Sequence, residues 1–100
     1  MAATATRRSI LLVEDDADLV QLVTHWLERE GYRVRSVASG NAALEALAAD
    51  PLPNLVLLDV MIPHISGFDI LRRVRTDART RTLPVVIMTS LTREKDVKHG

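Results

Sequence analysis

Polar side chains stand directly after three short apolar stretches of the chain. These residues are Glu14, Asp15 and Asp16, then Asp59, then Thr89 and Ser90. Carboxylates that meet at one place repel one another unless a cation lies among them. Hard oxygen ligands suit Mg²⁺, which commonly pairs one or two carboxylates with a phosphate, and hydroxyls and backbone amides can hold the phosphate oxygens. If the fold brings these residues together, we expect a site for a metal-bound phosphoryl group, with one carboxylate available as nucleophile.

The apolar stretches indicate the elements that would bring these residues together. Residues 10–13, 55–58 and 83–88 are almost continuously apolar, which is typical of strands buried on both faces of a parallel sheet. A weaker stretch, residues 32–37, alternates Val34 with arginines and predicts an edge strand. Because sites in open parallel sheets lie at the carboxyl ends of the strands, the polar residues are expected to converge there.

Helical patterns separate these strands. Apolar residues at a spacing of three and four form three stripes: Leu19, Leu22, Val23, Trp26 and Leu27; Ala43, Leu44, Leu47 and Ala48; and Phe68, Leu71 and Val74. Gly31 and Pro51 stop the first two helices, and Ser66 is a suitable N-cap for the third. Residues 92–99 predict the opening of a fourth helix. The alternation of strands and helices predicts a doubly wound α/β fold.

Some of these residues have a simpler explanation than a site. Aspartates at a helix start commonly cap it and complement its dipole, so Asp16 or Asp18 is expected to be the N-cap of the first helix. Asp59 is harder to explain this way, because no obvious helix start follows it. Trp26 fits the apolar stripe of the first helix and is expected to pack rather than to act in a site.

Composition limits the class of protein. The chain has 100 residues, 13 basic and 13 acidic side chains, no net charge and no cysteine. These values fit one small domain, residues 9–100, after a flexible leader, residues 1–8. They argue against a strongly basic nucleic-acid module, and the lack of an apolar run of about 20 residues argues against a membrane span. The absence of cysteine fits a reducing compartment, so a cytoplasmic location is expected.

One stretch is rich in arginine. Its members are Arg72, Arg73, Arg75, Arg79 and Arg81, which only Asp77 offsets. A nucleic-acid patch would interleave aromatic residues, and none is present there. The stretch is therefore expected to be a solvated helix end and loop.

Three segments together resemble a known family. Residues 10–16 (ILLVEDD), 57–67 (LLDVMIPHISG) and 85–90 (VVIMTS) look like the three signature stretches of response-regulator receiver domains, in the family's order and spacing. The resemblance runs from about residue 9 to residue 100. It implies a flavodoxin-like parallel sheet with strand order 2-1-3-4-5 and a role in two-component signalling.

The resemblance assigns a metal site and an acceptor. It implies that Asp59 is the phosphoacceptor and also a metal ligand. Asp15 is implied to place Mg²⁺ directly and Glu14 to do so through water. The main-chain carbonyl of Met61 matches the third protein ligand.

The resemblance also implies a switch and a partner. Thr89 matches the hydroxyl that moves toward the phosphoryl group, and Ser90 and Val60 match positions that contact it. The phosphoryl group would come from a sensor histidine kinase or a phosphotransfer protein. Such a domain is a switch that catalyses only its own phosphorylation and dephosphorylation, and direct contact with nucleic acid or membrane is not expected of it.

The sequence departs from the family at its end. A fifth strand, a fifth helix and a lysine that pairs with the phosphoryl group have no counterpart, since Lys95 and Lys98 both fall in the predicted fourth helix. We therefore expect a form truncated after the fourth helix begins, an engineered form, or a chain completed by another copy through dimerisation or strand exchange. Two alternatives remain: an interaction module that is not phosphorylated, and an aspartate-nucleophile phosphohydrolase. The second is disfavoured because Met61 stands where such enzymes need a second aspartate.

Overall fold

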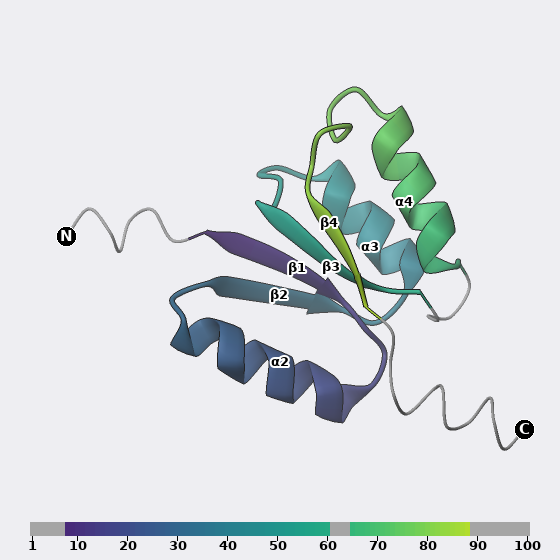
Figure 1. Ribbon diagram of the computed structural model, residues 1–100. Coiled ribbons are helices and arrows are strands. Elements are labelled where there is room, and N and C mark those ends of the chain that lie inside the picture. Colours follow the sequence, from purple (N-terminus) through teal and green to yellow (C-terminus); the bar gives the residue numbers. More distant parts are fainter. Residues whose placement is uncertain (1–7, 61–64, 89–100) are drawn as a thin grey trace, which may run out of the picture.

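The computed structural model describes residues 8–60 and 65–88 (Figure 1). The elements are β1 (Ser9–Val13), α2 (Ala17–Arg29), β2 (Arg33–Val37), α3 (Gly40–Ala48), β3 (Leu55–Asp59), α4 (Gly67–Thr76) and β4 (Val85–Met88). This order confirms the predicted alternation of strands and helices. The predicted leader up to residue 7 and the predicted fourth helix, residues 92–99, lie outside the described residues.

The four strands form one parallel sheet in the order β2-β1-β3-β4. This agrees with the first four places of the order that the resemblance implied, and β2 is an edge strand as predicted. The register pairs Val13 with both Val37 and Leu58, so β1 and β2 end at the same level and β3 runs one residue further, to Asp59. The fold is therefore receiver-like, but with four strands and three helices in the described residues it is shorter than a full receiver domain.

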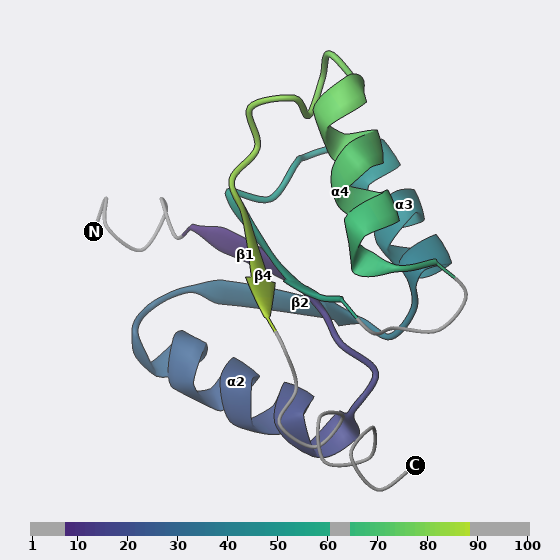
Figure 2. The same ribbon diagram turned by 45° about the vertical axis from the view of Figure 1, so that its right-hand side comes forward.

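The helices lie on both faces of the sheet. Helices α3 and α4 cover one face, and α2 lies on the other, below β2 (Figures 1 and 2). The largest core fills the space between the sheet and the helices α3 and α4, and its buried members are Leu11, Val13, Ala43, Ala46, Leu47, Val56, Leu58, Ile70, Val74 and Leu83. Ile10 and Leu12, which alternate with the core residues of β1, are also buried, so the central strand is covered on both faces.

Each helix begins at a side-chain cap. Asp16 accepts hydrogen bonds from the amides of Asp18 and Leu19 at 3.0 and 3.2 Å, which confirms it as one of the two candidate caps. Ser66 caps α4 as predicted. Gly31 has a φ of +96°, a conformation that strongly favours glycine, and it lies where the first helix was expected to stop.

Two packing predictions and one strand boundary were wrong. Trp26 and Phe68 have exposed fractions of 61% and 59%, so neither belongs to the buried face of its helix. The buried residues of α4 are Gly67, Ile70 and Val74, because α4 turns this side toward α3 and the sheet. The fourth strand begins at Val85 rather than residue 83, since Pro84 has no amide hydrogen and the amide of Leu83 closes a turn on Thr80.

The five arginines of the arginine-rich stretch are exposed, as expected, but two of their side chains also bind backbone carbonyls. Arg75 donates to the carbonyl oxygens of Arg81 and Leu83 at 3.1 and 2.7 Å. Arg79 donates to Asp50 and to the carbonyl oxygens of Leu47 and Ala49. Arg75 therefore holds the α4–β4 connection against α4, and Arg79 joins that connection to the end of α3. The sequence did not predict these contacts.

Candidate functional site

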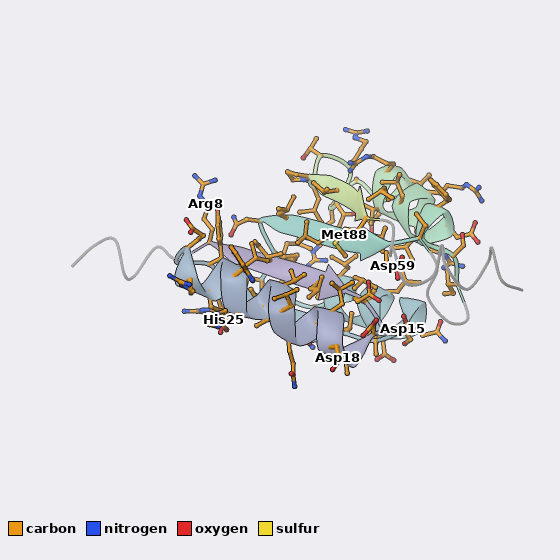
Figure 3. The ribbon with its side chains drawn as sticks, turned by 60° about the horizontal axis from the view of Figure 1, so that its bottom comes forward. Arg8, Asp15, Asp18, His25, Asp59 and Met88 are labelled. Atoms are coloured by element: carbon orange, nitrogen blue, oxygen red, sulfur yellow. The ribbon has the colours of Figure 1, made fainter. Side chains whose placement is uncertain are left out.

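The ends of two neighbouring strands bring the predicted acidic residues together. Val13 of β1 pairs with Leu58 of β3, so the residues that follow them, Glu14 and Asp59, lie side by side at this end of the sheet. Asp59 is the last residue of β3. Figure 3 shows Asp15 and Asp59 at the same end of the sheet. The predicted convergence of these carboxylates is therefore present in the fold.

The three carboxylates form a compact and sheltered cluster. One carboxylate oxygen from each of Glu14, Asp15 and Asp59 lies within 4.8 Å of the others. Glu14 and Asp59 are buried, with exposed fractions of 1% and 0%, and Asp15 is half-buried. Like charges held this close in a low-dielectric setting oppose one another, and a divalent cation among them relieves that repulsion.

Local hydrogen bonds orient Glu14. Its amide donates to the carbonyl oxygen of Val37 at 3.0 Å, which continues the pairing of β1 with β2 by one residue. Its Oε2 accepts a hydrogen bond from the amide of Asp16 at 3.1 Å. The start of α2 thus holds both Glu14 and Asp16. The Asp16 amide binds the Glu14 carboxylate, and the Asp16 carboxylate binds the amides of Asp18 and Leu19.

The backbone after Asp59 is fixed by both neighbouring elements. The amide of Val60 donates to the carbonyl oxygen of Met88 at 3.4 Å, and the amide of Gly67 donates to the carbonyl oxygen of Val60 at 3.0 Å. A Cβ atom on Gly67 would lie 2.7 Å from the carbonyl oxygen of Asp59, so only glycine lets α4 start this close to β3. The sequence signal for this contact is a glycine directly after the Ser66 cap, where the helix itself has no need of one.

Several predicted site residues are not described. Met61, Thr89 and Ser90 lie outside the described residues. Val60 is described and half-buried, and it continues the chain from Asp59. Met88 pairs with Asp59, so the described part of β4 ends beside the acidic cluster.

The donor set fits a hard divalent cation. All three side chains offer carboxylate oxygens, with no thiolate or imidazole among them. Mg²⁺ is commonly bound by one or two carboxylates, with waters and a phosphate completing its shell. The cluster is therefore chemically suited to hold Mg²⁺ next to the carboxylate of Asp59.

A comparison with protein families agrees with this geometry. The model of the response regulator receiver domain matches residues 10–100. The chain belongs to this family. It is therefore a receiver domain of two-component signalling, a class that typically works as a phosphorylation switch and takes its signal from a histidine kinase. None of the described helices is long and apolar enough to cross a membrane.

Curated relatives of the receiver domain include transcriptional regulators. The chain is 38% identical over 93 residues to the transcriptional regulatory protein GltR of Pseudomonas aeruginosa, which covers 93% of this chain and 38% of GltR. It is 40% identical over 92 residues to AfsQ1 of Streptomyces coelicolor, which covers 92% of this chain and 39% of AfsQ1. The receiver domain thus spans about two fifths of the length of these two relatives.

Solved structures share the fold of the receiver domain. A putative response regulator from Chloroflexus aurantiacus superposes with a TM-score of 0.81 at 30% identity, covering 94% of this chain and 79% of that one. The phosphorylated cyanobacterial phytochrome response regulator RcpA superposes with a TM-score of 0.79 at 27% identity, covering 94% and 73%.

Proposed function

We propose that this receiver domain accepts a phosphoryl group on Asp59 from a phosphohistidine of a sensor histidine kinase or phosphotransfer protein, with Mg²⁺ as cofactor. The observation that carries the proposal is the group of three carboxylate oxygens within 4.8 Å at the ends of β1 and β3. A relative of similar fold, RcpA, has been solved in a phosphorylated form. The family and the acidic cluster thus support the same chemistry.

The transfer needs one nucleophile and a fixed geometry. A carboxylate oxygen of Asp59 attacks the phosphorus atom in line, the phosphorus–nitrogen bond breaks, and its electron pair stays on the donor histidine. The backbone contacts of Val60 and Gly67 hold the end of β3, so Asp59 approaches from a defined direction. Positioning of this kind supplies much of the acceleration in phosphoryl transfer.

The neighbouring residues complete the proposed site. Asp15 and Asp59 would bind Mg²⁺ directly, Glu14 through water, and Met61 through its main-chain carbonyl. Bound Mg²⁺ neutralises charge on the phosphoryl oxygens. Ser90 and Val60 would contact the phosphoryl group.

The proposed output is a shift between two conformations. Phosphorylation adds about −1.5 to −2 charges at the end of β3. Thr89 would hydrogen-bond the new oxygens and shift the region after β4 between two forms. Hydrolysis of the acyl phosphate returns the domain to its first state.

Mass measurement after incubation with a small phosphodonor tests the proposal. With Mg²⁺ and acetyl phosphate, we expect one phosphate-sized addition, and none when Mg²⁺ is chelated. Asp59→Asn should abolish the addition. Asp18→Asn is the matched control, because Asp18 is an exposed acid of α2 outside the cluster. An addition that survives in Asp59→Asn, or none in the unchanged chain, would contradict the proposal.

A further inference from the structure

A second hollow lies at the other end of the sheet, where the strands begin. Its volume is about 380 Å³, within the range of small-molecule sites. It is lined by Ser9, Ile10 and Leu11 of β1, Arg33 and Arg35 of β2, Ala46 of α3, and the segment 51–54 that leads into β3. The acidic cluster lies at the opposite ends of the same strands, so the two sites are separate.

The hollow combines an apolar interior with a cationic rim. Leu11 and Ala46 are buried, and Leu52 is half-buried. Arg33 and Arg35 are both exposed, and the register pairs Arg35 with Leu11, which places both arginines on the α3 side of the sheet. A ligand in the hollow would therefore meet apolar carbon on one side and two guanidinium groups on the other.

Neither guanidinium group is satisfied within the described part of the chain. Arg72, Arg75 and Arg79 all hold a carboxylate or carbonyl oxygen there, whereas the side chains of Arg33 and Arg35 have no ion pair or hydrogen bond with any described residue. Residues 1–7, which precede β1, contain no acidic side chain. As far as the described residues and the composition of residues 1–7 go, both cations are available to an external anion.

The nearby end of α3 does not repel an anion. A helix C-terminus carries partial negative charge on its last carbonyls. Here Arg79 binds the carbonyl oxygens of Leu47 and Ala49, which offsets that charge. Arginines on an edge strand also protect it from pairing with other chains, but that role requires no hollow beside them.

We propose that this hollow binds a small organic anion, a carboxylate or phosphate group carried on an apolar body. Guanidinium groups bind both anions through paired hydrogen bonds, and the planar fork matches their oxygen geometry. The apolar body would lie against Leu11, Ala46 and Leu52. This site is independent of the phosphoacceptor site and does not require phosphorylation.

Amide NMR of the whole chain with phenylphosphonate as probe tests this site. A metal-free buffer keeps the probe from the acidic cluster. We expect saturable shifts at amides lining the hollow, and binding about tenfold weaker for methylphosphonate, which lacks the apolar body, and for benzyl alcohol, which lacks the charge.

Two variants separate specific binding from general attraction. Arg33→Gln together with Arg35→Gln should weaken phenylphosphonate binding about tenfold or more while the other amide signals stay in place. Arg72→Gln is the matched control and should bind as the unchanged chain does, because Arg72 is an exposed arginine of α4 that does not line the hollow. The proposal is overturned if the double variant binds equally well, if the shifts fall elsewhere, or if binding appears only after residues 1–7 are removed, because the chain itself would then fill the hollow.

Discussion

At the scale of single residues, the acidic side chains that follow β1 and end β3 have different roles. Asp16 serves the helix, because its carboxylate accepts two amides of α2. Glu14 and Asp59 are buried beside one another. This arrangement costs free energy, and the packing of the fold does not need it. The spacing of these acids after apolar runs predicted their meeting, since the end of a buried strand is fixed by its register. Spacing could not decide which of Asp16 and Asp18 caps the helix, because either position suits an N-cap.

Replacing Glu14 should weaken Mg²⁺ binding without removing the site. Glu14→Gln retains the shape of the side chain and its acceptor for the Asp16 amide but removes one charge. We expect Mg²⁺ affinity to fall by about tenfold to a hundredfold, the usual effect of losing a group that acts through a bound water. Titration with Mg²⁺ followed by amide NMR measures this. Asp18→Asn should leave the affinity unchanged, and equal affinity in Glu14→Gln would remove Glu14 from the site.

At the scale of elements, contacts between segments distant in sequence decide which side of a helix is buried, and the spacing of apolar residues alone does not. The predicted apolar stripe of α4 was Phe68, Leu71 and Val74, and only part of it faces the core: Val74 is buried and Leu71 is half-buried, whereas Phe68 is exposed. The close approach of Gly67 to the end of β3 fixes the rotation of α4, and that rotation buries Ile70, which the stripe did not include. Contacts of this kind depend on the fold, so the local pattern of apolar residues does not contain them.

Arg79 should contribute more to stability than Arg72, an exposed arginine of the same stretch. Arg79→Ala removes the hydrogen bonds to the end of α3. We expect a loss of about 1–2 kcal/mol in the free energy of unfolding, after discounting the exposed pair with Asp50. Urea unfolding measures this value.

Arg72→Ala provides the comparison for Arg79. Arg72 pairs with Asp69 at 3.2 Å, with side-chain exposed fractions of 74% and 49%. Exposed pairs of this type contribute little, so the midpoint should hardly move. A larger effect for Arg72→Ala than for Arg79→Ala would contradict the role of Arg79 in holding the α4–β4 connection to the end of α3.

At the scale of the whole molecule, the two faces of the sheet differ. One face is covered by α3 and α4, whereas on the other α2 lies below β2 (Figure 2). On that second side Leu22, Trp26 and Val86 have exposed fractions of 54%, 61% and 48%. The sequence predicted strands buried on both faces, and this holds for β1 but not for β4, because burial depends on what lies over each strand.

Val86 and the edge of β4 that the described residues leave unpaired should cause self-association. In the described residues β4 pairs only with β3. We expect the weight-average mass in sedimentation experiments to rise with concentration, and Val86→Lys to reduce that rise by placing a charge on the edge strand. Phe68→Lys is the control, since Phe68 is also exposed, at 59% against 48% for Val86, but lies on α4, on the other side of the sheet. A strictly monomeric chain at all concentrations would contradict this prediction.

Phosphorylation at Asp59 is tested by locating the phosphoryl group chemically. Borohydride reduces an acyl phosphate to an alcohol, which marks the modified aspartate permanently. After treatment with acetyl phosphate and Mg²⁺, peptide mass mapping should find the reduced side chain at Asp59 alone, and chelation of Mg²⁺ should remove it. Reduction at Asp15 or at an aspartate outside the cluster, with Asp59 unmodified, would contradict the assignment of Asp59 as the phosphoacceptor.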